Sequence, residues 1–324
     1  MPVLSSELRF HRAATASDAA ANGGRMTNAE LPDNVKNALF PDVTEAERAA
    51  GLARWRKLYV KNANADNLSL GQVGVCLARP ASGDPRVTLC AGTQTDTQAD
   101  LSSPVEYGAA ALEADVAAGA TSFAVLLEHQ SQAIFRDNAT IRIGTDSQGE
   151  YFAGVSVSQD GTRVTIQLAD GHALATSYSA ASAAVASVHE AGDLEPGFSG
   201  WSETSVEGVY DESTYPVELD NQACVQDAWT IVFTSATAFS CSGAATGALA
   251  PGSTDADYAP TNPDFGRPYF TLRAAGWSGT WASGNTLIFT TSPAALPLWL
   301  KQVTPAGAAA TASSAWRLVV RGEA

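Results

Sequence analysis

Short runs of alternating apolar and polar residues, separated by clusters of Gly, Pro, Asn and Asp, are the feature that most constrains this chain. In the clearest run, Trp55 and Tyr59 fall on one face of a strand with two lysines, while Leu58 and Val60 fall on the other. Such a period of two predicts half-buried β-strands. Similar runs are found at 68–77, 87–91, 121–127, 140–143, 151–157, 163–168, 229–233, 269–272, 286–290, 296–303 and 316–320.

Helical signals are confined to one short segment near residue 45. Thr44 is placed to cap a helix, Glu47 follows three residues later to complete a capping box, and Gly51 is a natural stop. Residues 159–162, by contrast, carry the composition of a tight hairpin turn. The sequence therefore predicts an all-β protein with one brief helix.

The order of the strand patterns predicts a discontinuous organisation. Residues 51–105 and 293–324 would together close one β-sandwich, because alternating patterns occur at both ends of the chain. Residues 106–195 would form an inserted small β-barrel, and residues 196–292 a second inserted domain resembling a β-sandwich. Residues 1–50 would be an extended arm and the short helix, since 13–24 is an Ala, Ser, Gly and Asn stretch without periodicity.

Charge is distributed unevenly along the chain. Residues 164–266 contain 14 Asp and Glu but no Lys or Arg, whereas the remainder holds 20 acids and 19 bases. We expect the acidic stretch to face solvent or a basic partner, because its carboxylates have no local cation to pair with. A phosphate backbone needs a basic surface, which argues against nucleic acid as a partner. The basic N-terminal segment is either a solvated arm or the one place where an acidic neighbour binds.

Cysteine usage and hydropathy indicate neither a membrane span nor a cleaved secretion signal. No uncharged apolar run reaches the length of a spanning helix, and Glu7, Arg9 and His11 stand where a signal peptide needs apolar residues. The cysteines, which lie in apolar strand-like runs without CxxC spacing, are predicted to be buried free thiols; they are Cys76, Cys90, Cys224 and Cys241.

No catalytic or cofactor motif emerges from the residues. The four histidines are too far apart in sequence for HExxH-type metal binding, and 276–279 lacks the spacing of a nucleophile elbow. Two acidic loops, at 211–212 and 254–257, are either solvated or weak calcium candidates. Three tryptophans either pack in a core or form a platform for sugars; they are Trp201, Trp277 and Trp281. We expect no enzymatic activity, no cofactor and no bound metal.

Two parts of the chain resemble virion structural proteins of tailed bacteriophages. The similar segments are 36–43, 45–51, 55–62, 91–98, 298–301, 303–308 and 316–319. The shared module of these proteins is an immunoglobulin-like β-sandwich, so the resemblance implies a discontinuous immunoglobulin-like sandwich here. It also implies a virion location and a structural role, as a neck or collar protein at the head–tail junction. A baseplate or capsid-decorating protein is the close alternative, and a carbohydrate-binding adhesin module is the second class.

The partners implied are other virion proteins, namely portal or connector, capsid or tail proteins, and further copies of the chain in a homo-oligomeric ring. The arm should carry this assembly, since it cannot bury enough apolar area alone to offset about 1–2 kcal/mol of ordering entropy per residue. Its cations would complement an acidic neighbour and its apolar residues would supply most of the affinity. The predicted interface residues are Arg9, Arg12, Arg25, Leu31, Val35, Lys36, Leu39 and Phe40.

Overall fold

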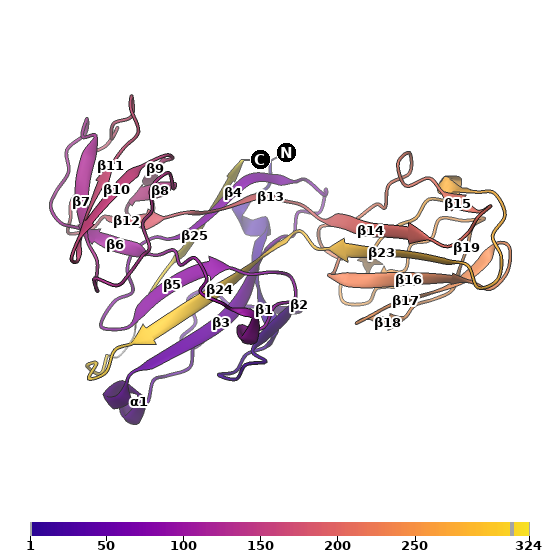
Figure 1. Cartoon of the computed structure of the whole chain (residues 1–324), viewed down its shortest axis with the longest axis horizontal. Helices are drawn as coiled ribbons and strands as arrows, with labels where there is room; N and C mark the ends of the chain where they lie inside the picture. The colour runs from indigo at the N-terminus through magenta and orange to yellow at the C-terminus, as the bar shows by residue number, and fades with distance from the viewer. Residues whose placement is uncertain (1, 312–313, 324) are drawn as a thin grey trace.

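Strands from both ends of the chain form one sandwich at the middle of the molecule (Figure 1). The computed structural model describes residues 2–311 and 314–323. In the larger sheet, β3 (Leu52–Asn62) pairs along its whole length with β24 (Ala295–Thr304), from Lys61 opposite Ala295 to Leu52 opposite Thr304. The order in this five-stranded sheet is β2-β1-β3-β24-β5, with β5 at Arg86–Ala91. The all-β prediction is confirmed.

A smaller sheet of three strands covers part of the larger one. Its order is β13-β4-β25, with bounds His189–Leu194, Leu70–Leu77 and Leu318–Glu323. The core between the two sheets is aliphatic and includes Leu58, Val60, Val75, Leu298 and Leu300. These are the inward positions of the alternating patterns, so burial follows directly from the period of two. The two sheets together are called the central sandwich below.

The N-terminal segment was wrongly expected to be an extended arm. Its residues instead form β1 (Leu8–Thr15) and β2 (Gly23–Glu30), which add a hairpin to the edge of β3. Leu8 and Phe10 pack against the central core, and the backbone of β3 supplies the hydrogen bonds. The patternless residues 16–22 connect the hairpin, with Asn22 fully buried. The expected mobile arm that orders only on a neighbouring subunit is therefore replaced by a hairpin on its own subunit.

The short helix and its caps are confirmed. Helix α1 (Glu45–Ala50) begins after Thr44, whose side chain accepts a hydrogen bond from the Glu47 backbone N–H, while the Glu47 carboxylate accepts from the Thr44 backbone N–H. The helix ends at Gly51, where φ is 79°. Three single-turn 3-10 helices accompany it, at Ser5–Glu7, Gln98–Asp100 and Ala274–Gly276.

The outer face of the five-stranded sheet is covered by the chain after β5, which explains part of the sequence pattern at 91–98. Lys57 is buried there; its Nζ lies 2.6 Å from Asp96 Oδ1 and donates to the Gly24 carbonyl oxygen at 2.7 Å. Trp299 Nε1 donates to the second carboxylate oxygen of Asp96 at 2.8 Å. Gly23 is required beside them, because a Cβ at its φ of 105° would lie 2.6 Å from the Trp299 ring.

The first insert, residues 106–188, is a seven-stranded sheet that curls over its own core. The order is β10-β11-β7-β6-β12-β8-β9, and β9 does not pair with β10 within the described residues, so strand pairing does not close the predicted small β-barrel. In the same order, the bounds are Ser156–Asp160, Arg163–Gln167, Ser122–Leu126, Ala109–Leu112, Ala184–Ser187, Ile141–Gly144 and Gly149–Phe152. The following strand, β13, pairs with β4, so residues 189–194 lie in the central sandwich and not in this insert.

The second insert, residues 196–292, stacks a six-stranded sheet on small pieces of strand and loop. The order is β14-β23-β16-β17-β18, and β19 also pairs with β17. The bounds of these strands are Gly197–Glu203, Thr286–Ser292, Asp227–Phe233, Ala238–Gly243, Gly247–Ala248 and Gly252–Ser253. Two short ribbons complete it: β15 (Val209–Tyr210) with β22 (Trp277–Ser278), and β20 (Thr261–Asn262) with β21 (Arg267–Pro268).

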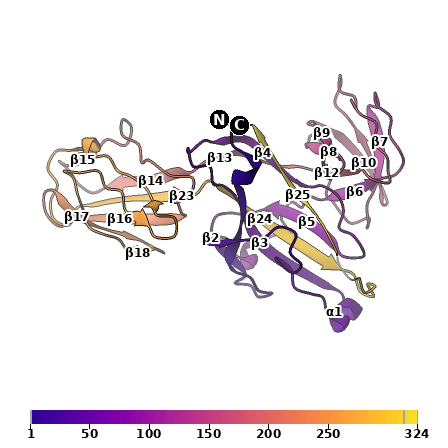
Figure 2. The same cartoon turned by 180° about the vertical axis from the view of Figure 1, so that it is seen from behind.

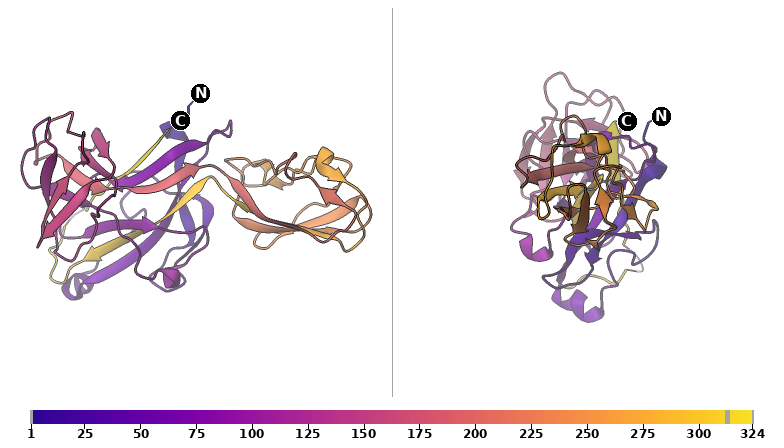
Figure 3. Two further views of the ribbon diagram at one scale, coloured as in Figure 1. Left: turned by 45° about the horizontal axis from the view of Figure 1, so that its top comes forward. Right: turned by 90° about the vertical axis from the view of Figure 1, so that its right-hand side faces the viewer.

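The two inserts lie on opposite sides of the central sandwich, which gives the molecule an elongated outline (Figures 2 and 3). Residues 61–68 of the central sandwich contact the second insert. Asn221 Nδ2 donates to the Leu68 carbonyl oxygen at 2.9 Å, and Lys61 Nζ donates to the Gln222 carbonyl oxygen at 2.6 Å. This joint is polar, in contrast to the apolar cores on either side.

The expectations for cysteines and for the acidic stretch are both confirmed. All four thiols are free and buried, and burial raises the pKa of each one, to about 11 for Cys76 and about 12 for Cys224. Of the 14 acidic residues in 164–266, only Asp227 is buried, and it pairs with Arg25 from outside the stretch at 3.3 Å. Carboxylates without local cations thus remain at the surface, as their desolvation cost demands.

Candidate functional site: a groove beside an arginine network

A groove opens at the α1 end of the central sandwich, where strands cover the inner face of the large sheet incompletely. β3 and β24 are longer than the three strands opposite them, so loops complete the cover at this end. The covering segments are 31–43, 308–311 and 314–317. They leave a cavity of about 880 Å³, a size typical of a binding site.

The lining combines apolar side chains with a few charged ones. Apolar contacts are made by residues such as Phe10, Leu39, Phe40 and Trp316, and the cations Lys36, Arg48 and Arg317 also line the groove. Asp33 and Asp42 are the acidic members of the lining.

Three polar side chains that line the groove each have a buried oxygen atom with no hydrogen-bond partner among the described residues: Gln302 Oε1, Thr304 Oγ1 and Ser314 Oγ. Thr304 is only 3% exposed. Gln302 and Thr304 lie on β24, opposite Arg54 and Leu52 of β3. An unpaired buried hydrogen-bonding group costs about 1–3 kcal/mol. A ligand or segment with matching polar groups would relieve that cost.

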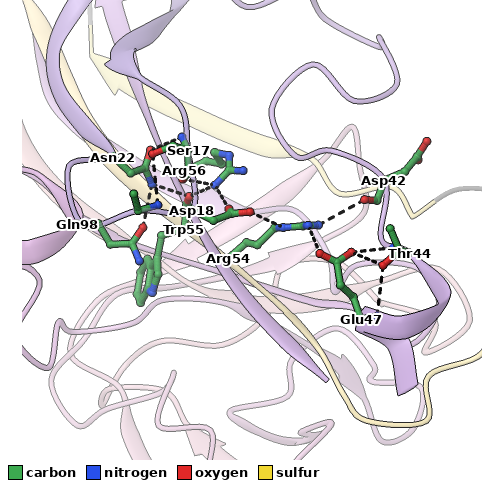
Figure 4. Close-up of polar contacts among 11 residues, drawn as sticks. Ser17, Asp18, Asn22, Asp42, Thr44, Glu47, Arg54, Trp55, Arg56 and Gln98 are labelled. Carbon is green, nitrogen blue, oxygen red and sulfur yellow. Dashed lines mark hydrogen bonds and ion pairs between the residues drawn. The ribbon is translucent and has the colours of Figure 1, made fainter. Parts of the chain in front are cut away.

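An arginine network borders the groove (Figure 4). Arg54 and Arg56 occupy inward positions of β3 and are nearly buried. Arg54 NH2 lies 2.6 Å from Glu47 Oε1, and both arginines contact Asp18, at 3.2 Å from Arg54 and 2.7 Å from Arg56. Arg54 also donates to the carbonyl oxygen of Asp42 at 3.4 Å. Loop 16–22, loop 31–43 and α1 are thereby tied to β3.

Electrostatics stabilise the ionised form of the carboxylates in this network. Burial alone would raise the pKa of Asp18, but hydrogen bonds and charge from Arg56 and Arg54 outweigh burial and lower it. The pKa of Glu47 is lowered mainly by the backbone N–H of Thr44, with a further contribution from Arg54. The network is fully charged near neutral pH, and it holds the groove wall in place.

The structure brings together five of the eight residues predicted to form an interface. Leu31, Val35, Lys36, Leu39 and Phe40 all line the groove. Val35 is 54% exposed, whereas Phe40 is buried in the central core. These residues therefore lie together at the groove, although Phe40 packs on its own subunit, and their role as an assembly interface stays a prediction.

The three N-terminal arginines lie outside the groove. Arg9 is exposed on β1, and Arg12 is half-buried on the same strand. Arg25 is engaged within the chain by Asp227 of the second insert. Arg25 therefore binds a carboxylate of its own chain, whereas it was expected to face an acidic neighbour.

Sequence reasoning missed Arg54, Gln302 and Thr304. A usable signal was present, because Arg56 shares a strand face with Leu58 and Val60. A charged side chain on a core face must have buried partners, and those partners mark a polar network.

The other candidate residues have structural contacts. Trp201, Trp277 and Trp281 pack in the aromatic core of the second insert, where Trp281 stacks on Phe233 at 4.1 Å between ring centroids. In the acidic loops, Asp257 is bound by Arg273 at 2.7 Å and Asp211 accepts the backbone N–H of Thr214. Among residues 2–311 and 314–323, no three His, Cys, Asp or Glu side chains are grouped as a metal ion would require. None of the helices in this described part is long and apolar enough to cross a membrane.

Comparisons with known proteins do not assign this chain to a family. No protein-family model matches the chain, and no curated protein matches it. Among solved structures, the complex of the two major capsid proteins VP16 and VP17 of bacteriophage P23-77 aligns over 78% of this chain and 98% of that chain, with 7% identity and a TM-score of 0.17. VP17 of the same phage aligns over 78% and 96%, with 7% identity and a TM-score of 0.16. At these scores the alignments carry no conclusion about fold or function.

Proposed function

We propose that this protein is a structural component of a tailed-phage virion, specifically a neck or collar protein at the head–tail junction, and that it has no enzymatic role. Its neighbours would be portal or connector, capsid or tail proteins. A baseplate or capsid-decorating position is the alternative within the same particle. The sequence segments similar to phage virion proteins support the class.

The groove is the observation that carries the proposal. It contains a cavity, an exposed apolar side chain at Val35, and side-chain oxygens of Gln302, Thr304 and Ser314 that have no hydrogen-bond partner among the described residues. Two of the segments similar to phage proteins, 36–43 and 303–308, contribute to its lining. These features fit a surface that receives a segment of a neighbouring protein, and the three tryptophans that suggested sugar binding are used in a core.

Purified particles of the phage that encodes this chain provide the first test. Mass spectrometry of gradient-purified particles should detect the chain in a fixed ratio to the other structural proteins. Antibody-gold labelling should then place it at the neck. Absence from washed particles would refute the virion role, whereas labelling at the baseplate or over the capsid would refute only the neck position.

A matched pair of variants tests the groove itself. Val35→Glu places a charge in the groove, and Val105→Glu places the same charge at a residue of nearly equal exposure, 51%, that does not line it. In a complementation assay, Val35→Glu should reduce incorporation into particles at least about tenfold, the loss that about 1.4 kcal/mol of binding free energy produces. Val105→Glu should incorporate normally. Equal incorporation of the two variants would remove the groove from the proposal.

A further inference from the structure

The outward face of the main sheet of the second insert carries no charged side chain. Inward positions of β16 and β23 are buried, and their outward positions are Ala, Thr, Val, Ile and Ser. The strand register aligns these outward residues into rows. One row runs across the sheet through Ser202, Ile288, Thr230, Ser242 and Ala248.

Neighbouring rows have the same character. Thr290 lies between Ser199 and Ala228, and Thr286 lies opposite Val232, which in turn lies opposite Ser240. All these side chains are exposed or half-exposed. We call this surface, formed by the outward residues of β14, β23, β16 and β17, the charge-free face.

Its lack of charge contrasts with the rest of the domain. Residues 196–292 contain ten Asp and Glu and two Arg, a net charge of −8. The four strands of the face include only two charged residues, Glu203 and Asp227, and both turn to the other side of the sheet. Glu203 accepts hydrogen bonds from Trp201 Nε1 and the Tyr210 backbone N–H, and Asp227 is buried.

Several hydroxyl groups on the face have no side-chain hydrogen bond within residues 196–292, all of which are described. Thr230, Thr290, Ser202 and Ser242 are in this state, whereas Thr204 and Thr286 bond to each other at 3.2 Å. Thr, Val and Ile are stiff at χ1, so they lose little rotamer entropy when they are covered. These side chains are therefore already restricted in rotamer before any contact forms, and the free hydroxyl groups can form hydrogen bonds with a second surface.

We propose that the charge-free face binds the same face of a second copy of this chain. Two copies, each with a net charge of −15, repel wherever their acidic loops approach. A contact through the charge-free face keeps carboxylates out of the interface. A basic partner would bind the acidic loops instead, so the face best suits a partner of the same charge. A face that meets itself about a two-fold axis also needs no second complementary surface.

The area of the face sets the expected strength. Four strands about 4.8 Å apart and about seven residues long, at about 3.3 Å per residue, present on the order of 400 Å² per copy. Two faces then bury on the order of 800 Å², below the 1,200–2,000 Å² typical of stable complexes. The contact should be weak in free solution and become effective where an assembly holds copies close together. The inference does not depend on the virion proposal, since it concerns the purified chain alone.

Sedimentation equilibrium of the full chain tests the proposal. From about 10 µM to about 1 mM, the wild type should show a reversible monomer–dimer equilibrium. Dimerisation should strengthen between about 20 mM and about 500 mM NaCl, because salt screens the repulsion between the acidic bodies. A monomer throughout this concentration range, or a dimer that salt weakens, would overturn it.

Matched lysine variants locate the contact. Ile288→Lys and Thr230→Lys should each weaken dimerisation at least about tenfold, whereas Leu126→Lys, on an outward position of β7 in the first insert, should not. Ile288 is 40% exposed and Leu126 is 41% exposed, so the two substitutions are comparable. Near-ultraviolet circular dichroism verifies the folding of each variant, and Thr230→Lys provides the test if Ile288→Lys is misfolded. Dimerisation of both face variants at the wild-type strength would exclude the face, as would an equal loss in Leu126→Lys.

Discussion

The two inserts have similar charge but place it differently. The first insert has nine acids and three bases over 106–188, and the second has ten acids and two bases over 196–292. On the first, an ion pair between Arg163 and Glu113, 2.9 Å apart, lies on the exposed side of the sheet. On the second, the corresponding side of the sheet has none. Net charge therefore does not decide which insert has a surface suited to association; the strand positions of the charges do.

Their cores differ as well. The core of the first insert is mostly aliphatic, around residues such as Val125, Ile143 and Ile166. The second insert holds 14 of the 26 aromatic residues of the chain, and Trp229, Phe233, Phe239 and Phe289 are fully buried in its core. Aromatic side chains bury a large area each, which compensates for a domain in which much of the chain is loop. The inserts thus reach stability through different side chains within the same all-β class.

The largest expected effect tests whether the two inserts unfold independently. Trp229 is fully buried, and its Nε1 donates to Thr291 Oγ1 at 2.8 Å. Trp229→Ala should lower the free energy of unfolding of the second insert by about 3–5 kcal/mol, because it creates a cavity and leaves the Thr291 hydroxyl without that donor. Hydrogen exchange should show the loss of protection confined to 196–292.

The matched change in the first insert is Ile166→Ala, at a fully buried aliphatic position. It should cost about 2–5 kcal/mol and reduce protection only within 106–188. If either variant lowers protection equally in both inserts, the molecule unfolds as one unit. The difference between the two cores would then not give the inserts separate stabilities.

A second prediction concerns the one buried carboxylate of the acidic stretch. Asp227 accepts backbone N–H groups from Ala228, Ala245 and Thr246, and it pairs with Arg25. Burial alone would raise its pKa, but these hydrogen bonds outweigh burial and lower it. Asp227→Asn should therefore cost about 1–3 kcal/mol at neutral pH, because it removes a charged acceptor from backbone N–H groups, while Arg25, whose side chain is 36% exposed, can turn to solvent.

The pH dependence gives the sign of this effect. Because the folded pKa is lowered, the contribution of Asp227 is complete above the unfolded value of about 3.9 and is lost as pH falls through the folded pKa. Urea unfolding followed by tryptophan fluorescence should show the wild type and the variant converging in acid. Four of the seven tryptophans lie in the second insert and report on it. Asp255→Asn, an exposed control, should be neutral; a neutral Asp227→Asn would contradict the prediction.

Local patterns predicted much of the fold, and long-range pairing explains what they missed. Strand alternation around Leu58 and the Thr44 cap are set by nearby residues, so the sequence alone predicted them. The addition of β1 to β3 depends on residues about 50 positions apart, and the small residues at 16–22 gave no sign of it. The groove depends on the relative lengths of strands that face each other across the two sheets, which no local pattern reports.

The charge-free face depends both on local strand patterns and on long-range strand pairing. Its outward residues can be found in the alternation of each strand, for example Thr230 and Val232 beside buried Ile231. The face becomes visible only when the register sets Thr230 beside Ile288 and Ser242. A chain can thus encode each row locally while the surface itself appears only after the strands pair.

At the joint with the second insert, the lysine of the central sandwich is buried and has a carbonyl acceptor, whereas at the first insert Lys301 is half-buried and pairs with the Glu106 carboxylate at 2.6 Å. Lys61 is 1% exposed, with Nζ 4.1 Å from the centroid of the Phe265 ring and the Gln222 carbonyl oxygen as its acceptor. Burial lowers its pKa to about 8. The unfolded chain therefore binds more protons than the folded one between about pH 8 and about pH 10.4, so the stability contributed by this site rises with pH across that window.

The measurement compares the wild type with Lys61→Met. Relative to the variant, the wild type should gain on the order of 2 kcal/mol in free energy of unfolding between pH 7 and pH 10, because a pKa shift of one unit corresponds to about 1.4 kcal/mol. Using the difference between the two proteins cancels the titration of tyrosines and the general repulsion of the acidic chain. A wild-type curve parallel to that of the variant would show that Lys61 keeps its ordinary pKa.

The smallest expected effect returns to the outward face of the first insert. Arg163 and Glu113 are both well exposed, and such pairs contribute little to stability because solvent screens them and the side chains lose entropy on pairing. Glu113→Gln should therefore leave the free energy of unfolding unchanged within the error of the measurement. Its effect on the sedimentation of the full chain should also be absent, because this face is not the one that dimerises. Equilibrium unfolding and sedimentation of the same preparation check both points. A marked gain in dimerisation on removal of this carboxylate would mean that the charged face of the first insert is the self-association surface held apart by its charge, and the contrast between the two inserts would then be reversed.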